Sequence, residues 1–129
     1  LFSDPKFSFE ILTGDARTML PEYVKGHPAS WDAIYQDAFS PKRNPALWTK
    51  EWFTLLRENS APDVILSTYS ASSSIRKSLL EGGWKIYAGE KFGAKRASTR
   101  ARLTGDTDPD ILDSLARAPV RALSDKDIE

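Results

Sequence analysis

The stretch WDAIYQDAFSPKRNPALW, residues 31–48, decides the fold because an apolar run passes through a turn into the start of a helix. Its first part, Trp31 to Asp37, predicts a strand that is apolar enough to lie in the centre of a sheet. Two prolines and an asparagine then predict a turn, and helical spacing of apolar residues over Ala46 to Asn59 predicts a helix. A strand that ends in an acid and continues through a helix is typical of an α/β protein.

The alternation of strand and helix patterns continues on both sides of this stretch. Strands are predicted over residues 7–13, 64–69, 84–87 and 97–103, and helices over residues 16–24, 70–81 and 110–118. The order predicts right-handed crossovers and a mostly parallel sheet whose last strand is antiparallel. Ligands of such open sheets bind beyond the carboxyl ends of the strands, where Asp15, Asp37 and Tyr69 fall.

Composition narrows the classes of function. The 129 residues, 40% hydrophobic and 28% charged, predict one folded domain or a large piece of one. The 18 basic residues balance the 18 acidic residues, so nucleic-acid binding would need a local basic patch. The sequence has no cysteine, which excludes thiolate catalysis and is compatible with the cytoplasmic location that we expect. We expect no membrane association, because no apolar run approaches the roughly 20 residues of a membrane helix.

Asp37 and Asp15 each allow two interpretations. Asp37 precedes a proline-containing turn, where Asp is often a turn or capping residue, but it also ends a strand where ligands bind. Asp15 could cap the next helix, or it could accept a hydrogen bond from the exocyclic amino group of a nucleotide-like ligand beside the Ala16 N–H. Both roles of Asp15 are compatible. The expected meeting of Asp15, Asp37 and Tyr69 at one edge of the sheet favours a site.

The segment KFGAKRASTRAR, residues 91–102, carries five cations in an otherwise neutral sequence. On a strand, Arg100 and Arg102 would share one face, and such charge could simply protect an edge strand from aggregation. Together with Lys42 and Arg43, however, the segment predicts a phosphate-binding rim. Four aromatic side chains near this edge could stack an extruded base, although Trp48 is better explained as core: Phe39, Trp48, Tyr69 and Phe92.

Several signatures of other chemistries are missing from the sequence. The one histidine, His27, lies in a Gly-His-Pro loop and is expected at the surface, so neither a catalytic triad nor a histidine metal site is expected. The serine-rich run at residues 70–74 lacks the Gly-Lys of a P-loop and favours helix capping, with Ser70 as the cap. No G-x-G-x-x-G turn is present. Either the ligand is not a bulky cofactor, or the glycine-rich unit lies outside this sequence.

A resemblance to a known family bears on this choice. ILTGDARTMLPEY followed by WDAIYQDAF resembles the middle of class I S-adenosylmethionine-dependent methyltransferases. More specifically, QDAFSPKRNPALW, STYSASSSIRKSLLEGGW and KFGAKR are similar to the methyltransferase domain of the bacterial tRNA wobble-uridine enzymes that make 5-methylaminomethyl-2-thiouridine. The sequence departs from that pattern at Ala38, at residues 75–77 and at Trp84.

The resemblance implies a Rossmann-like class I methyltransferase fold of which this chain holds the C-terminal part. Residues 1–104 would form a partial methyltransferase domain, residues 105–129 a tail, linker or short helix, and the glycine-loop unit would lie outside the chain. S-adenosylmethionine is the implied cofactor, with Asp15 and Ala16 on its adenine side. The implied partners are the tRNA anticodon loop and a flavin-dependent oxidoreductase domain, fused or separate.

The implied reaction is N-methylation of the aminomethyl group of wobble 5-aminomethyl-2-thiouridine. Asp37 would hold the amine and help to remove its proton. The remaining implied site residues would stack the uridine or bind phosphates: Phe39, Lys42, Arg43, Tyr69, Phe92, Lys95 and Arg96. Two alternatives stay open, a methyl- or aminopropyl-transferase acting on a small amine and a truncated, non-enzymatic binding module.

Overall fold

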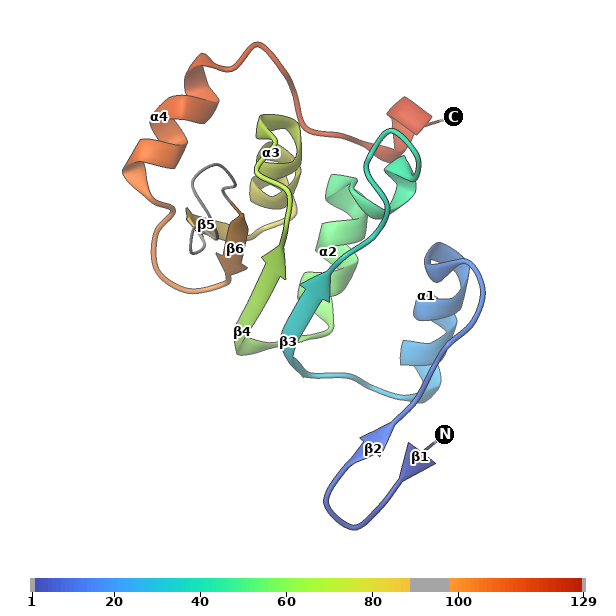
Figure 1. Ribbon diagram of the computed structural model, residues 1–129. Helices are drawn as coiled ribbons and strands as arrows, with labels where there is room; N and C mark the ends of the chain where they lie inside the picture. Colours follow the sequence, from blue (N-terminus) through green and yellow to red (C-terminus); the bar gives the residue numbers. More distant parts are fainter. Residues whose placement is uncertain (1, 89–97, 129) are drawn as a thin grey trace.

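The computed structural model describes residues 2–88 and 98–128 and shows an α/β arrangement (Figure 1). In chain order the elements are β1 (Phe2–Ser3), β2 (Ser8–Phe9), α1 (Ala16–Gly26), β3 (Trp31–Gln36), η1 (Pro45–Leu47), α2 (Lys50–Glu58), β4 (Ser60–Thr68), α3 (Ser73–Glu81), β5 (Lys85–Ala88), β6 (Thr99–Arg102), α4 (Pro109–Arg117) and η2 (Asp125–Ile128), where η denotes a 3-10 helix. The strand and helix patterns of residues 31–118 are therefore confirmed to within a few residues.

Over residues 2–88 and 98–128 the main sheet has four strands in the order β3-β4-β6-β5. β3 and β4 are parallel, whereas β6 lies between β4 and β5 and is antiparallel to both. β5 consequently runs in the same direction as β3 and β4. This arrangement confirms the expectation of a mostly parallel sheet whose last strand is antiparallel.

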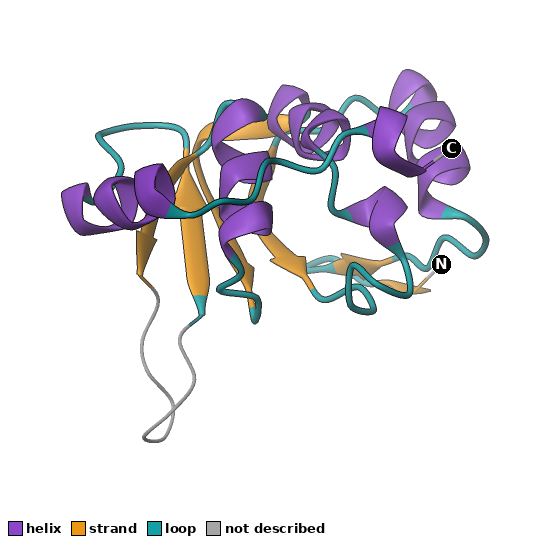
Figure 2. Cartoon of the chain, turned by 90° about the horizontal axis from the view of Figure 1, so that it is seen from above, coloured by secondary structure: helices purple, strands orange, loops and turns teal. Residues whose placement is uncertain are grey.

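The two faces of the sheet differ in burial. Along β4, Val64, Leu66 and Thr68 are buried, while Ile65 and Ser67 on the other face are more exposed. The buried face packs on α2 and α3 to form the core, whose members are Trp48, Trp52, Phe53, Leu56, Val64, Leu66, Ile75, Leu79, Trp84, Ile86, Ala101, Ile111 and Leu115. Figure 2 shows helices gathered along one side of these strands. The period-two pattern of β6 and of the second half of β4 therefore assigns their residues to a core face and an open face.

Each of the four α-helices in the described residues begins at a residue whose side chain accepts a hydrogen bond from a backbone N–H in the first turn. These residues are Asp15, Thr49, Ser72 and Asp108. Such caps satisfy amides that have no partner within the helix. The expectation that Ser70 caps α3 is wrong, because the chain stays extended for two further residues and Ser72 accepts from the Ile75 N–H.

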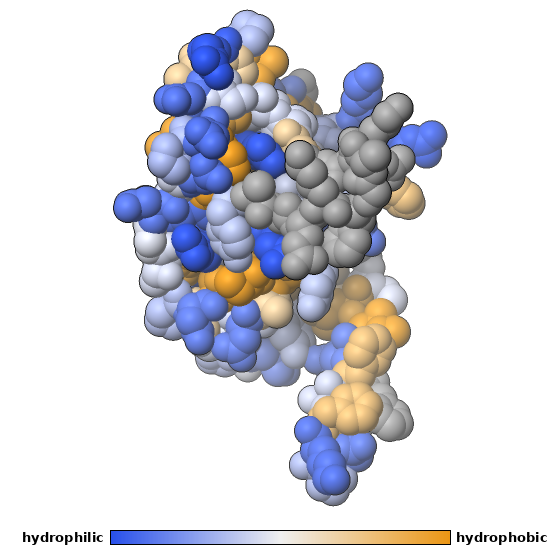
Figure 3. All heavy atoms as spheres, turned by 60° about the vertical axis from the view of Figure 1, so that its left-hand side comes forward, coloured by the Kyte–Doolittle hydropathy of each residue, from blue (hydrophilic) through white to orange (hydrophobic). Residues whose placement is uncertain are grey.

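Two expectations for the N-terminal half are also wrong. The strand predicted over residues 7–13 is reduced to Ser8–Phe9, which pairs with β1 and lies outside the main sheet. Its apolar residues find no core in the described part of the chain: Phe7, Phe9 and Ile11 are 55%, 57% and 69% exposed. Figure 3 shows this segment projecting from the body of the molecule with hydrophobic side chains along it. The strand predicted to be central, β3, instead forms an edge of the described sheet, and Tyr35 is 82% exposed.

The C-terminal residues pack back on the body. α4 contacts α3 and β5, and Ile111, Leu115 and Ala122 are buried. After α4 the chain crosses α3 and reaches α2, where the Lys50 N–H donates to the Leu123 carbonyl at 2.9 Å. Within residues 2–88 and 98–128, none of the helices combines the length and the apolar character that crossing a membrane requires.

Candidate functional site

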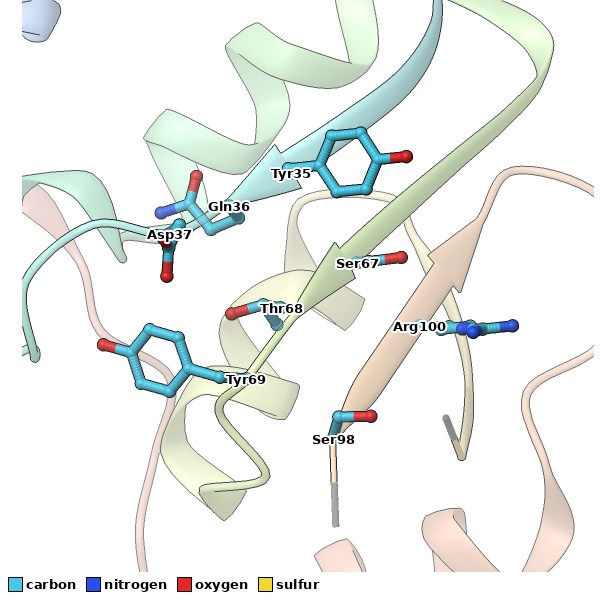
Figure 4. A pocket seen from close by; sticks show the side chains of 8 residues that line it. All are labelled: Tyr35, Gln36, Asp37, Ser67, Thr68, Tyr69, Ser98 and Arg100. Atoms are coloured by element: carbon cyan, nitrogen blue, oxygen red, sulfur yellow. The ribbon is translucent and has the colours of Figure 1, made fainter. Parts of the chain in front are cut away.

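An open pocket of about 430 Å³ lies at the carboxyl ends of β3 and β4. Its walls come from three neighbouring strands and the residues just beyond them: Tyr35, Gln36, Asp37, Ser67, Thr68, Tyr69, Ser98 and Arg100 (Figure 4). Asp37 and Tyr69 were both expected at this edge, and the structure brings them together. This is the edge at which open α/β sheets bind their ligands.

Asp37 is the first residue beyond β3, and its side chain is exposed. In the described lining it is the one carboxylate, and Arg100 is the one cation. Because side chains alternate along a strand, the burial of Gln36 directs its two neighbours, Tyr35 and Asp37, away from the core. The core therefore fixes the direction in which the acid points.

The loop that follows Asp37 is held by donors from the protein interior. Trp48, which is fully buried, donates its indole N–H to the Phe39 carbonyl at 2.8 Å. The buried Gln36 side-chain amide donates to the Leu47 carbonyl at 2.6 Å, and its oxygen accepts from the Trp52 indole N–H at 3.3 Å. Trp48 and Trp52 are thus core residues, as the sequence indicated. The Trp48 indole nevertheless binds the backbone of the exposed loop directly, and the Trp52 indole holds the Gln36 side chain that also binds it.

Tyr69 follows β4 and forms the opposite wall. Its hydroxyl donates to the Ala38 carbonyl at 2.8 Å, and its ring meets Trp48 edge-on with centroids 5.8 Å apart. The ring is still 51% exposed, so it combines a structural contact with an accessible aromatic surface. Phe39, across the loop, is 74% exposed. Phe39 does not line the pocket, but its accessible ring lies two residues after Asp37 on the same loop and could stack on a ligand.

The expected basic residues divide into a described and an undescribed group. Lys42 and Arg43 are exposed on the loop after β3. Arg43 and Asn44 donate their backbone N–H groups to the Ser40 carbonyl, which closes the turn that carries both cations. The predicted site residues Phe92, Lys95 and Arg96 lie outside the described residues.

Asp15 and Ala16 begin α1 and do not line the pocket. Asp15 Oδ1 accepts from the Arg17 N–H at 3.0 Å, and the Asp15 carbonyl accepts from Thr18 and Met19, so the capping interpretation is confirmed. Within the described part of the chain, Asp15 Oδ2 and the Ala16 N–H have no hydrogen-bond partner. One acceptor and one donor are therefore presented side by side at the start of a helix.

Two arginines near the site have shifted pKa values. A hydrogen bond from Arg17 lowers the pKa of the Asp125 carboxyl, and the same bond raises the pKa of Arg17. Burial lowers the pKa of Arg76, whose Nε donates to Thr99 Oγ1 at 2.9 Å and whose Nη2 donates to the Ser98 carbonyl at 3.2 Å. Arg76 thereby ties α3 to the start of β6, next to the pocket.

Sequence reasoning missed a row of residues that crosses the open face of the sheet. Tyr35 pairs in register with Ser67, and Ser67 pairs with Arg100. Strand alternation could have placed Tyr35 with Asp37 and Ser67 with Tyr69. It did correctly place Arg100 and Arg102 on one face, with Thr99 and Ala101 buried on the other.

In the described ranges no group of His, Cys, Asp and Glu side chains could hold a metal ion.

Comparisons with known proteins give the chain a family context. Residues 2–104 match the family model described as S-adenosyl-L-methionine-dependent methyltransferase. The chain is 36% identical over 101 residues to the tRNA 5-methylaminomethyl-2-thiouridine biosynthesis bifunctional protein MnmC of Cupriavidus metallidurans, an alignment that covers 78% of this chain and 14% of that protein. The protein of the same name from Ralstonia nicotianae is 34% identical over 101 residues, covering 78% of this chain and 15% of the relative.

A solved structure shows the same fold. The crystal structure of MnmC2 from Aquifex aeolicus superposes with a TM-score of 0.81 at 32% sequence identity. The match covers 99% of this chain and 42% of that chain. The described arrangement therefore corresponds to less than half of the solved neighbour, and to about one seventh of the two curated relatives.

Proposed function

The chain belongs to the family of S-adenosyl-L-methionine-dependent methyltransferases, and from this membership we propose that it carries the acceptor side of a tRNA-methylating enzyme. The reaction we propose is methyl transfer to the nitrogen of the aminomethyl group on wobble 5-aminomethyl-2-thiouridine. The names of the relatives support both the nucleoside and the tRNA. The observation that carries the proposal is the exposed Asp37 carboxylate in a strand-end pocket, at the start of the loop that also exposes Phe39, Lys42 and Arg43.

The start of α1 fits one end of the cofactor. The adenine ring of S-adenosylmethionine offers an exocyclic amino donor and ring-nitrogen acceptors, which match Asp15 Oδ2 and the Ala16 N–H. The positive end of the helix dipole lies at the same point and stabilises negative charge on Asp15. When bound, S-adenosylmethionine supplies an electrophilic methyl group on a positively charged sulfur.

Asp37 would act on the amine that receives this methyl group. An alkylamine is mostly protonated near neutral pH and must lose a proton before its lone pair can attack. The carboxylate would hold the ammonium by a charge-assisted hydrogen bond, orient the nitrogen and accept the proton directly or through a water molecule. Alignment of the amine and the methyl group within near-attack distance would supply much of the remaining acceleration.

The surface around Asp37 would hold the anticodon loop. Phe39 and Tyr69 present accessible rings on which an extruded uridine can stack, and Lys42 and Arg43 would contact phosphates. On the strength of the KFGAKR motif alone, we also propose RNA contacts for Phe92, Lys95 and Arg96. A tRNA substrate implies an enzyme of the cytoplasm.

The domain organisation is part of the same proposal. Residues 1–104 would be the partial methyltransferase domain, and residues 105–129 a tail that folds back on it. The curated relatives are named bifunctional. We therefore infer that a flavin-dependent oxidoreductase, fused or separate, acts in the same modification.

Replacing Asp37 by Asn tests the catalytic proposal. In the native polypeptide that contains this sequence, D37N should lower kcat for 5-aminomethyl-2-thiouridine tRNA by about 100-fold or more, since general acid–base groups contribute roughly 10²–10⁴. Affinity for tRNA should stay within about twofold. D32N is the matched control, because Asp32 is an exposed carboxylate on the same strand but away from its carboxyl end. Normal turnover by D37N would remove Asp37 from the mechanism.

The tRNA itself is tested by the salt dependence of binding. The double variant K42A/R43A should weaken tRNA binding and reduce the slope of log affinity against log salt by about 0.7 for each phosphate that is no longer neutralised. A transferase acting on a small amine would show neither effect, although it could still depend on Asp37. Methylation of a free polyamine at the rate expected for tRNA would replace the proposed substrate.

A further inference from the structure

The last residues of the described chain form a strap, here defined as residues 118–128, that runs over two helices. Its backbone is bound along the way by side chains of α3. Lys77 Nζ donates to the Ala118 carbonyl at 3.0 Å, Ser74 Oγ donates to the Arg121 carbonyl at 2.8 Å, and the Leu123 N–H donates to Ser78 Oγ at 2.8 Å. The strap ends in η2, which lies beside the loop that follows β3 (Figure 1).

At this end the strap meets Arg17, one residue beyond the Asp15–Ala16 pair. Arg17 Nη1 and Nη2 donate to Asp125 Oδ1 and Oδ2 at 2.9 and 2.6 Å, a two-pronged ion pair. Arg17 Nη1 also donates to the Ala46 carbonyl at 2.8 Å and to Thr49 Oγ1 at 3.2 Å. One guanidinium therefore joins three segments that are far apart in the sequence.

The partner side of this contact is fixed as well. Glu51, in the first turn of α2, accepts from the Asp125 N–H at 2.8 Å and from Ser124 Oγ at 3.0 Å. Thr49 is the N-cap of α2 and is fully buried. The carboxylate of Asp125 is thus presented to Arg17 by a folded end of the strap rather than by a free terminus.

We propose that Arg17 and Asp125 form a latch that positions the cofactor-side turn, residues 14–16, against the acceptor loop, residues 37–48. Arg17 and Asp125 are positioning residues in this proposal, which rests on the proposed function for its catalytic consequence. The two parts of the site lie on different elements, and the described contacts of Arg17 link them directly. The latch would set the distance between the adenine end of the cofactor and the loop that begins with Asp37.

The chemistry of the contact suits a positioning role. A planar guanidinium that meets a carboxylate through two parallel hydrogen bonds fixes direction as well as distance, which a lysine ammonium cannot do. The side chains are 27% and 38% exposed, so the pair is only partly open to solvent. By contrast, the pair between Lys50 and Glu81 is 3.6 Å long and its side chains are 41% and 52% exposed. An exposed single contact of that kind holds no fixed geometry.

The experiment compares D125N, R17K and the control E81Q in the native polypeptide. Hydrogen exchange tests the latch in the absence of any substrate. D125N and R17K should raise the exchange rates of the amides of residues 38–48 and of the first turn of α1 by at least about tenfold. Exchange in α4 should not change. E81Q should leave all of these segments as in the wild type.

Activity reports the positioning role separately. Both latch variants should lower kcat for tRNA methylation by about 10- to 100-fold while the tRNA Kd changes less than about twofold, because a misplacement of about 1 Å can cost that much in rate. R17K, which keeps the charge, should not restore kcat. Retention of wild-type exchange in the loop by both variants would overturn the latch.

Failure of the proposed function gives a different pattern. In that case the wild type would not methylate the tRNA, whereas the exchange difference between D125N and E81Q would persist. If D125N does not fold, R17K decides the question, because it leaves the strap and its contacts with Glu51 unchanged. Normal exchange and normal kcat in a folded R17K would also reject the proposal.

Discussion

Trp48 offers the sharpest test of how the core supports the site. Its ring is fully buried, and its indole N–H donates to the carbonyl of Phe39 in the exposed loop. W48F keeps an aromatic ring in the core but removes this donor. Trp84 supplies a matched control, because it is 1% exposed and donates to the Phe53 carbonyl at 2.9 Å, in α2 and not in the loop.

The size of the effect follows from three contributions. Loss of one hydrogen bond to a backbone carbonyl costs about 1 kcal/mol. A phenyl ring buries roughly 40 Å² less apolar surface than an indole, which is about another 1 kcal/mol at 25 cal/mol per Å². A partly filled cavity adds a similar amount. We therefore expect W48F and W84F to lower the free energy of unfolding by about 2–3 kcal/mol each.

The two variants should differ in the loop. Urea denaturation should show similar losses of stability for W48F and W84F. The hydrogen-exchange rates of residues 38–44 should rise in W48F alone, because only W48F removes the donor to the Phe39 carbonyl in the loop. Binding of tRNA should weaken in W48F by several-fold at equal folded fraction. The reasoning would be refuted by equal loop exchange in the two variants, since stability alone would then control the loop.

Two further predictions concern packing and pH. G82A should destabilise the chain by about 1–3 kcal/mol in urea denaturation, because a Cβ at Gly82 would lie 2.8 Å from Phe53 Cβ and 3.2 Å from the Lys50 carbonyl. G26A is its control, with no atom within 4 Å of the added Cβ, and equal stability of the two variants would contradict the packing. The Arg17 hydrogen bond lowers the pKa of Asp125 below its ordinary 3.8. The ion pair therefore stabilises the folded chain fully above that pH, and this stabilisation is lost as the pH falls through the pKa of Asp125 in the folded state. The stability difference between wild type and D125N should accordingly shrink as the pH falls below about 4, and a difference that does not change down to pH 2 would exclude that linkage.

Local patterns predicted most of the fold because they reflect local physics. The helices of residues 46–81 have apolar spacing and polar caps that need no knowledge of the sheet, and strand alternation placed Arg100 and Arg102 correctly on one face. The strand over residues 7–13 was wrong because apolar alternation gives a strand only where a partner strand and a core are available. The central position of β3 was wrong for the same reason, since order in a sheet is a tertiary property.

The candidate site was predictable where it depended on strand ends and was missed where it depended on pairing. Asp37 and Tyr69 were placed at one edge by the rule for open sheets, and they meet in one pocket. Arg100 could not be assigned to that pocket in advance, because β6 enters the sheet between β4 and β5. Likewise, the ion pair of Arg17 with Asp125 joins residues 108 positions apart, and no local pattern indicates such a contact.

Two buried side chains and the half-exposed Tyr69 bind the backbone of the exposed loop. Three of its carbonyls, those of Ala38, Phe39 and Leu47, accept from the Tyr69 hydroxyl, the Trp48 indole and the Gln36 amide. Those donors satisfy the hydrogen-bonding needs of the three carbonyls, so the exposed side chains of the loop need not hold the loop backbone in place. Leaving a Phe ring 74% exposed forgoes roughly 2 kcal/mol of burial. Because these donors hold its backbone, the loop can sustain that cost and still expose the Asp37 carboxylate, the Phe39 ring and both cations.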